Sequence, residues 1–284
     1  MNKFEQRYFP LKRAYPRRSL HFRRCRGFVF SRRKERGKLL TALRCSIPDA
    51  PGCAGKRLVF IADWHWHDSP RNFRLLEELE RLLAANPADA LLLGGDMCDD
   101  ACLLSQLPPL LRELSRLAPV TLAVGGNWEA GKRWLDGGFF RRLYADCGIT
   151  LLENDTVSLG NFRFFGMPDI SSTDFTATPR SPEKSPGVTN ILLLHSPDAA
   201  VSLDRENFLD AFHLALCGHT HGGQVRLPLI GALCCRSFYG RRFDRGAFIH
   251  TPSGMKMLVS QGIGEHRGHF RLFCPPEAVI LEFT

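Results

Sequence analysis

Five short apolar segments of the chain are each followed, within three residues, by a side chain that can bind a metal ion. The segments are 58–62, 90–93, 120–124, 191–194 and 214–217, and the side chains that follow them are Asp63, Asp96, Asn127, His195 and His219. The segments are rich in aliphatic residues without polar alternation, which is typical of strands covered on both faces. Because ligands bind beyond the carboxyl ends of such strands, we expect the five side chains to share one crevice.

The segments between and after these strands predict the fold class. Amphipathic stretches at residues 73–85, 103–117 and 132–147 predict helices, and strands that alternate with helices are typical of an α/β domain. After residue 221, segments such as 256–260 and 278–283 predict antiparallel strands that close a second sheet. The Ser-, Thr- and Pro-rich stretch 171–189 predicts an exposed loop.

The spacing of the candidate ligands adds two further histidines. Asp63 and His65 are separated by one residue, and so are His219 and His221, so each pair can direct two donors to one place from an extended chain. A mixed set of His, Asp and Asn donors suits manganese, iron or zinc better than calcium. We therefore expect a transition-metal site.

Taken in order, these residues resemble the motif set of calcineurin-like metallophosphoesterases. The matching strings are Asp63-x-His65, Gly95-Asp96-x-x-Asp99, Gly126-Asn127, His195 and Gly218-His219-Thr220-His221. The resemblance implies a two-sheet α/β/β/α sandwich with a dinuclear metal site at the carboxyl ends of its strands. It implies one ion held by Asp63, His65, Asp96 and His221, and a second held by Asp96, Asn127, His195 and His219.

The resemblance also implies the chemistry. Two divalent ions that share Asp96 hold a bridging hydroxide, which attacks a phosphoanhydride or phosphodiester without a nucleophile from the protein. Manganese is favoured over iron or zinc. We expect a metal-dependent hydrolase of phosphoric esters or anhydrides.

One position departs from the family pattern. The family commonly has His after Gly-Asn, where it assists the leaving oxygen, whereas this chain has Trp128. An indole donates one N–H but cannot transfer a proton near neutral pH. The substitution therefore favours a leaving group that is already a weak base, such as the phosphate of a phosphoanhydride. In the alternative, His67, His266 or His269 supplies the proton.

Three further strings refine the resemblance. Residues 218–224, 260–264 and 274–277 are similar to the bacterial membrane-associated branch of the family, which includes UDP-2,3-diacylglucosamine hydrolases of lipid A synthesis. This branch implies a phosphorylated, lipid-linked nucleotide as the substrate.

Positive charge is concentrated at the start of the chain. Residues 1–38 contain 14 Lys or Arg against two Glu, a net charge of +12, so the overall +9 leaves −3 for the rest. We expect residues 1–38 to be a flexible or membrane-surface extension and residues 39–284 to be the metallophosphoesterase domain. Because each Lys or Arg near an anionic leaflet contributes about 1 kcal/mol, the segment predicts a peripheral protein at the inner membrane face.

Composition also bears on the compartment. The ten cysteines are dispersed and form no CxxC pair, which favours a reducing, cytoplasmic location. No apolar run in the basic segment is long enough to span a membrane.

Two other functions remain open. A general phosphodiesterase or nuclease would use the basic segment to bind nucleic acid, although the charge of −3 on the rest of the chain disfavours this. A catalytically silent metal-binding module is the other, and the complete set of ligands disfavours it.

Several side chains permit two interpretations. Asp99 and Asp100 either orient ligand histidines or cap a helix. Trp64 and Trp66 either pack inside the domain or line a lipid groove. The arginines that form either a solvated loop or a diphosphate clamp are Arg236, Arg241, Arg242 and Arg245. For His21, His213 and His250 we expect structural roles.

Overall fold

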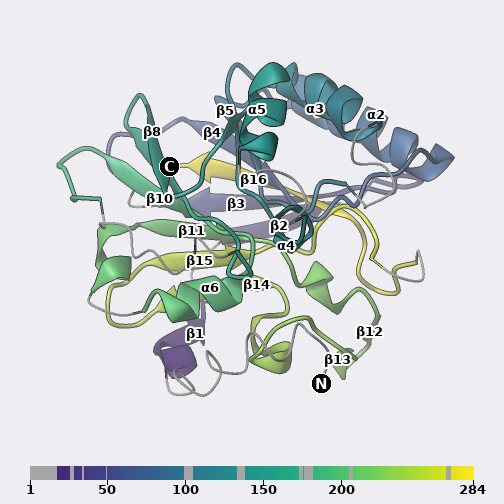
Figure 1. The fold of residues 1–284 in the computed structure, drawn as a ribbon. Coiled ribbons are helices and arrows are strands. Elements are labelled where there is room, and N and C mark those ends of the chain that lie inside the picture. The colour runs from purple at the N-terminus through teal and green to yellow at the C-terminus, as the bar shows by residue number, and fades with distance from the viewer. Residues whose placement is uncertain are drawn as a thin grey trace.

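The computed structural model contains two seven-stranded sheets. It describes residues 18–25, 29–33, 35–48, 50–98, 105–132, 138–172, 175, 182–204, 207–266 and 270–284. The sheets lie against each other in the middle of the molecule, with helices on both outer sides (Figure 1). The predicted α/β/β/α sandwich is therefore confirmed.

The first sheet contains the early strands of the chain. Its order is β2 (Val29–Arg33), β3 (Thr41–Ile47), β16 (Glu277–Phe283), β4 (Arg57–Ile61), β5 (Ala90–Leu93), β6 (Thr121–Ala123) and β7 (Thr150–Leu151). Strands β4 to β7 are parallel, while β16 is antiparallel to β4 and parallel to β3.

The second sheet contains most of the later strands. Its order is β1 (Phe22–Arg24), β14 (Gly246–His250), β15 (Lys256–Val259), β11 (Leu214–Cys217), β10 (Thr189–Leu193), β9 (Phe162–Gly166) and β8 (Asp155–Leu159). Strands β9, β10, β11 and β15 are parallel. A separate two-stranded hairpin, β12 (Arg226–Leu227) and β13 (Gly231–Ala232), lies outside both sheets (Figure 1).

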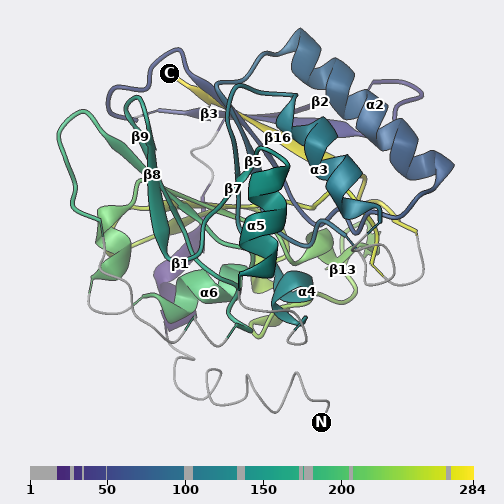
Figure 2. The ribbon, with the colours of Figure 1, turned by 45° about the horizontal axis from the view of Figure 1, so that its top comes forward.

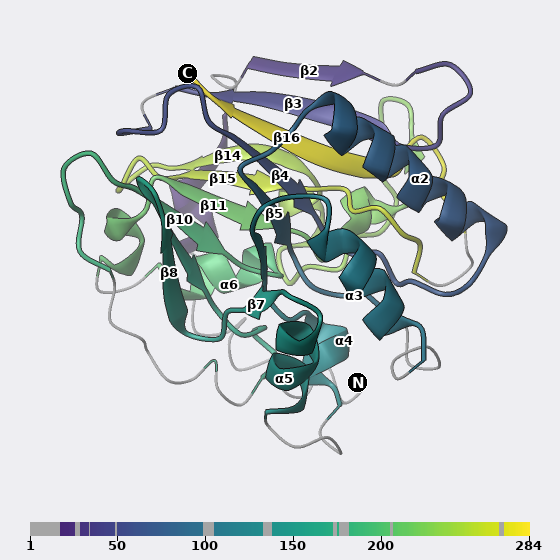
Figure 3. The ribbon, with the colours of Figure 1, turned by 90° about the horizontal axis from the view of Figure 1, so that it is seen from above.

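The helices cover the outer faces. They are α2 (Pro70–Ala85), α3 (Leu107–Ser115), α4 (Asn127–Ala130), α5 (Phe139–Asp146) and α6 (Pro197–Ser202), with 3-10 turns η1 (Arg18–His21), η4 (Phe208–Ala211), η5 (His221–Gly223) and η6 (Gly240–Phe243). Helices α2, α3 and α5 lie over the first sheet, and α6 lies on the opposite side of the molecule (Figures 2 and 3).

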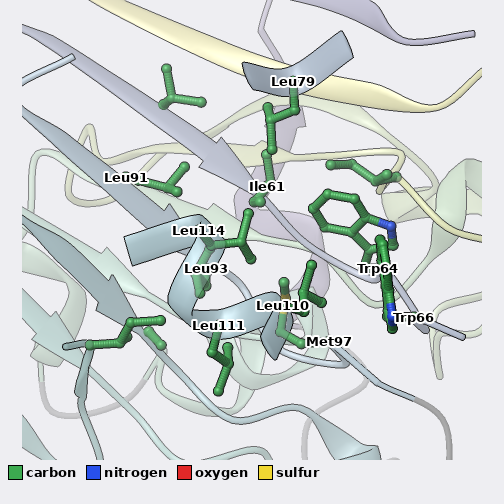
Figure 4. Packing of buried hydrophobic residues seen from close by; sticks show 14 of the residues in the cluster. Ile61, Trp64, Trp66, Leu79, Leu91, Leu93, Met97, Leu110, Leu111 and Leu114 are labelled. Carbon is green, nitrogen blue, oxygen red and sulfur yellow. The ribbon is translucent and has the colours of Figure 1, made fainter. Parts of the chain in front are cut away.

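Three apolar cores hold these layers together. One lies between the first sheet and α2, α3 and α5, where Leu75, Leu79 and Leu83 of α2 belong to the same buried cluster as Ile61. Figure 4 shows Leu79 of α2 facing Ile61 of β4. A second joins the two sheets, and a third joins the second sheet to α6. Each fully buried leucine contributes about 2 kcal/mol. This packing fixes the strand ends from which the site is built.

The structure confirms the five strands predicted before the ligands but corrects their grouping. Strands β4, β5 and β6 belong to the first sheet, whereas β10 and β11 belong to the second. The prediction of antiparallel strands that close a second sheet after residue 221 is confirmed in part. Strand β15 lies in the second sheet, antiparallel to β14 and parallel to β11, whereas β16 lies inside the first sheet. An apolar segment reveals that it is a strand but not which strand it pairs with.

The expected helices and loop are only partly described. Helix α2 begins at residue 70, before the predicted 73, because the Ser69 hydroxyl caps it by accepting a bond from the Asn72 amide at 3.2 Å. Helices α3 and α5 lie within the other two predicted stretches, and residues 99–104 and 133–137 lie outside the described residues. Within the predicted loop 171–189, residues 173–174 and 176–181 also lie outside them.

The boundary predicted at residue 38 is corrected for the residues that the structure describes. Strand β1 pairs with β14 and strand β2 pairs with β3, so residues 22–24 and 29–33 are parts of the two sheets. Phe22 is fully buried, and Arg32 forms an ion pair with buried Glu277 at 2.6 Å. The aromatic residues among the arginines provide this packing. The prediction for residues 1–17 lies outside the described residues.

Candidate metal centre

The seven predicted ligands come from loops at the ends of strands in both sheets. Asp63 and His65 follow β4, Asp96 follows β5, Asn127 begins α4 after β6, His195 follows β10, and His219 and His221 follow β11. All but Asn127 are buried. The two sheets therefore meet at one site, and the structure brings all seven side chains together.

Five of these residues have a backbone that non-glycine residues rarely adopt. Their φ angles are positive: Asp63 (54°), His65 (50°), Asp96 (53°), His219 (71°) and His221 (50°). Asp and His tolerate this region better than bulky residues, yet such strain persists only where the surroundings impose it. Strain concentrated in this way is typical of a functional site.

The first group of donors consists of Asp63, His65 and His221. One donor atom from each residue lies within 4.8 Å of the others. The Nε2 atoms of His65 and His221 are 3.1 Å apart, and the two rings are stacked at 5.0 Å. Burial and the nearby charge of His65 hold the pKa of His221 well below its usual range, so its ring is neutral and suited to a metal.

The second group consists of Asp96, His195 and His219, with Asn127 beside them. His195 Nδ1 lies 2.7 Å from the Gly94 carbonyl oxygen, to which it donates, so in the neutral ring Nε2 carries a lone pair. That atom faces Asp96 Oδ2 at 3.3 Å, Asn127 Oδ1 at 3.2 Å and His219 Nδ1 at 3.2 Å. A carboxylate oxygen of Asp96, an amide oxygen of Asn127 and two imidazole nitrogens therefore lie close together.

Asp96 lies between the two groups. Its Oδ2 is 3.3 Å from His195 Nε2 and 3.7 Å from His65 Nε2, while its Oδ1 accepts a bond from the Trp128 amide at 2.8 Å. This is the position that a bridging carboxylate requires. The donors therefore form two groups with Asp96 between them, and the assignment of these residues as ligands of two ions stays a prediction.

The electrostatics of the site favour added positive charge. Although burial opposes a charged imidazole, Asp96, Asp63 and Asp169 raise the pKa of His195 well above its usual range. Burial also raises the pKa of Asp63 to about 6, with a contribution from Asp96. Buried groups that bind a proton tightly can bind a metal cation in its place. The mixture of His, Asp and Asn donors suits a divalent transition metal.

Glu129 is an important residue that the sequence reasoning did not select. Its buried carboxylate accepts bonds from the amides of Asp96 (3.1 Å), Met97 (3.0 Å) and Gly126 (2.9 Å). It thereby holds the loop after β5 against the loop after β6. Its position two residues after Asn127 could have identified it in the sequence, because a carboxylate beside metal ligands usually orients them.

Trp128 lies at the edge of the site. Its ring makes edge-on contacts with His65 and with His266, both at 5.5 Å, and its buried Nε1 has no hydrogen-bond acceptor among the described residues. His266 also lies 5.2 Å from the His65 ring. Of the three alternative proton donors, His266 therefore adjoins the ligands, whereas His67 Nδ1 lies 3.2 Å from the backbone oxygen of His65. His269 lies outside the described residues.

The structure distinguishes among the four arginines left open. Arg242 donates to the carbonyls of Ser19 and Phe22, Arg241 donates to those of Ile230 and Ala232, and Arg245 bonds to Gln261, so these three support the fold.

Arg236 is the fourth of these arginines. It is exposed, and it acts on the metal centre electrostatically: after burial and the charge of His195, Arg236 helps lower the pKa of His219 to about 3.

The structure also decides between the alternatives for the tryptophans and for two of the histidines. Trp64 and Trp66 are buried and pack edge to face at 5.6 Å in the core beneath α2, so they are packing residues (Figure 4). Asp99 and Asp100 lie outside the described residues. His21 and His250 both contact Asp204, at 2.7 and 3.1 Å, and so hold the start of β1 against β14.

Comparison with known proteins agrees with this site. The model of the family described as calcineurin-like phosphoesterase matches residues 56–223. The chain is 28% identical to the phosphodiesterase YaeI of Escherichia coli, over 80% of this chain and 82% of that protein. It is 27% identical to the uncharacterized metallophosphoesterase YkuE of Bacillus subtilis, over 81% and 79%.

Among solved structures, the chain is similar to a dimetal phosphatase from Danio rerio, with 12% identity and a TM-score of 0.48. The match covers 74% of this chain and 88% of that chain.

Proposed function

The chain belongs to the calcineurin-like phosphoesterase family and is a metal-dependent phosphoester hydrolase, and from this premise we propose that it cleaves the phosphoanhydride of a lipid-linked nucleotide such as UDP-2,3-diacylglucosamine. The observation that carries the proposal is Trp128. It stands beside His65 where a proton donor would assist the leaving oxygen. A phosphate leaving group needs that assistance least.

The residues of the site have distinct parts in this reaction. Asp63, His65, Asp96, Asn127, His195, His219 and His221 would hold two divalent ions, for which we propose manganese. Bound ions supply Lewis-acid charge to the phosphoryl group and to the attacking water. Glu129 keeps the loops of Asp96 and Asn127 in place. The Trp128 indole offers its unused N–H to a substrate oxygen.

We also assign a substrate contact to Arg236. Its guanidinium is exposed on the segment after β13, and a guanidinium can bind a phosphate oxygen of the nucleotide through two parallel N–H donors. Replacing Arg236 by Gln should raise KM about tenfold with a small change in kcat, because a lost charge-assisted bond is worth about 1.5 kcal/mol. Arg81→Gln, an exposed arginine on α2, is the matched control. A KM equal to that of the control would exclude the contact.

The basic start of the chain supports a membrane location. Residues 1–38 carry a net charge of +12, and we propose that they hold the enzyme at the cytoplasmic face of the inner membrane. Removal of residues 1–17 leaves β1 and β2 intact and should weaken binding to anionic vesicles at low salt. Unchanged binding would contradict the proposal.

The substrate is tested by phosphorus NMR of the manganese-loaded protein with UDP-2,3-diacylglucosamine in detergent micelles. The proposal predicts UMP and the lipid sugar phosphate, and neither product with Asp96→Ala. It also predicts slower cleavage of an alkyl phosphomonoester. Equal rates on both substrates would contradict the argument from Trp128, and would direct attention to His266 as the missing donor.

A general phosphodiesterase is the second candidate, and the name of the Escherichia coli relative favours it. Hydrolysis of simple phosphodiesters that depends on Asp96, with no turnover of the lipid nucleotide, would select this candidate.

A further inference from the structure

Large hydrophobic side chains are exposed at few described positions, and most of them lie together. Six of the eight are in two segments: Leu229, Ile230 and Leu233 in and after the β12–β13 hairpin, and Phe270, Leu272 and Phe273 before β16. We call these six residues the apolar platform. Large exposed apolar patches on soluble proteins usually mark an interaction surface.

Backbone hydrogen bonds join the two segments into one surface. Val225 and Leu272 form a parallel bridge, in which the Arg226 amide donates to the Leu272 carbonyl at 2.9 Å and the Leu272 amide donates to the Gln224 carbonyl at 3.1 Å. The Leu233 amide donates to the Val225 carbonyl at 3.0 Å. The platform is therefore a bonded unit and not a set of unrelated loops.

The tip of the hairpin is unusual in its backbone as well. Leu229 is fully exposed, and its φ of 66° lies in the left-handed region that glycine and asparagine occupy more easily. A leucine at this turn therefore has an unfavourable backbone and leaves its whole side chain in water. A leucine that carries both costs indicates a side chain used in contact with something apolar.

The platform is attached directly to the metal centre. The chain runs from His221 through Gln224 into β12, and the Gln224 side chain bonds to the backbone nitrogen and oxygen of His266, both at 2.8 Å. The Arg271 guanidinium donates to the carbonyls of His221 (3.3 Å) and Gln261 (2.9 Å). A surface that contacts the platform thus lies beside the site of hydrolysis.

The surrounding charge identifies the kind of surface. Residues 224–246 contain five arginines and one aspartate, a net charge of +4, and of these arginines Arg236 and Arg241 are exposed. Arg241 is exposed and donates to the Ile230 and Ala232 carbonyls at the base of the hairpin. Aliphatic and aromatic side chains surrounded by arginine suit the interface of an anionic bilayer. Among the described residues no helix could cross a membrane, so this contact is peripheral.

We propose that the apolar platform inserts into the surface of an anionic lipid bilayer and thereby presents the metal centre to lipid-linked substrates. The inference rests on the proposed lipid-linked substrate. It adds a structured, hydrophobic contact that is distinct from the basic residues 1–17.

The test is flotation of the full-length protein with vesicles of phosphatidylcholine, with and without phosphatidylglycerol. The double variant Leu229→Glu, Ile230→Glu should bind the anionic vesicles at least about tenfold more weakly, because two apolar insertions are lost and two negative charges are added. Phe73→Glu, an exposed apolar residue on α2, is the matched control and should bind like the wild type. Part of the wild-type binding should persist in high salt, since apolar insertion is not screened.

The inference would be overturned if the wild type did not bind anionic vesicles, or if the double variant bound them as well as the control. It would also be overturned if the wild type were a dimer and the double variant a monomer, because the platform would then be a contact between two copies of the chain. Hydrolysis of bis(p-nitrophenyl) phosphate without vesicles should be the same in both variants. If the wild type lacks this activity, the proposed function fails while the flotation result can still be interpreted.

Discussion

The metal centre and the apolar platform are neighbours in the chain but differ in how the sequence encodes them. His221 belongs to the first, and Leu229 follows only eight residues later in the second. The metal centre is largely buried, polar and built from five loops of two sheets, whereas the platform is exposed, apolar and joined by backbone hydrogen bonds. Metal-binding side chains at strand ends can therefore be recognised in a sequence. Exposed apolar residues cannot, because in the sequence they look like residues of the hydrophobic core.

The largest expected effect is a loss of hydrolysis when the metal centre is changed and the platform is left intact. Asp96→Ala removes the carboxylate between the two ligand groups, so phosphodiester hydrolysis should fall by at least about 10³-fold. Vesicle binding should not change, because Asp96 does not contact the platform residues. The variant's kcat and flotation are compared with those of the wild type. Substantial residual hydrolysis would show that Asp96 is not the shared ligand.

Arg271 lies between the metal centre and the apolar platform, so its replacement tests how much this connection contributes to stability. Its guanidinium donates to the carbonyls of His221, Gln261, Gly264 and Cys274. Arg271→Met removes the guanidinium donor from these oxygens, of which the His221 oxygen keeps its bond from the Gln224 amide, and should reduce the free energy of unfolding by about 3 kcal/mol. Urea unfolding measures the loss. Arg271→Lys, which keeps the charge but not the fork of donors, should recover less than half of it.

Glu129 tests whether the loops of the metal centre need an organising carboxylate. Glu129→Gln replaces an acceptor oxygen by a donor amide facing the amides of Asp96, Met97 and Gly126. Metal affinity should fall about 10- to 100-fold, as for other groups that orient ligands. Isothermal titration with Mn²⁺ measures the change. An affinity equal to that of the wild type would make Glu129 a packing residue only.

The smallest expected effect concerns the loop after the hairpin. Asp198 is buried and accepts bonds from the Ser237 hydroxyl (2.6 Å) and the Phe238 amide (2.8 Å), and burial, with a smaller contribution from Asp169, raises its pKa to about 6. The folded protein therefore binds a proton more tightly than the unfolded chain does. This group should stabilise the fold by about 1 kcal/mol more at pH 5 than at pH 7.

Asp198→Asn removes this contribution. Urea unfolding of both proteins across that pH range isolates it, because the other titrating groups are shared. Parallel stability curves would contradict the raised pKa.

How much the sequence could predict follows from these particular residues. The ligands were identified because Asp, Asn and His at strand ends have few structural reasons to recur there. The division of β10 and β11 from β4, β5 and β6 was not predictable, because pairing depends on partners distant in the chain. Phe22 was assigned to a surface extension because its arginine neighbours hid its burial. Exposure of Leu229 likewise depends on what the fold leaves uncovered.

The most direct test of the metal centre is a titration of the metal-free protein with Mn²⁺ while bis(p-nitrophenyl) phosphate hydrolysis is followed. The two groups of donors joined at Asp96 predict no hydrolysis without metal and a plateau at two equivalents per chain. Full hydrolysis after complete removal of metal, or a plateau at one equivalent, would contradict the dinuclear site.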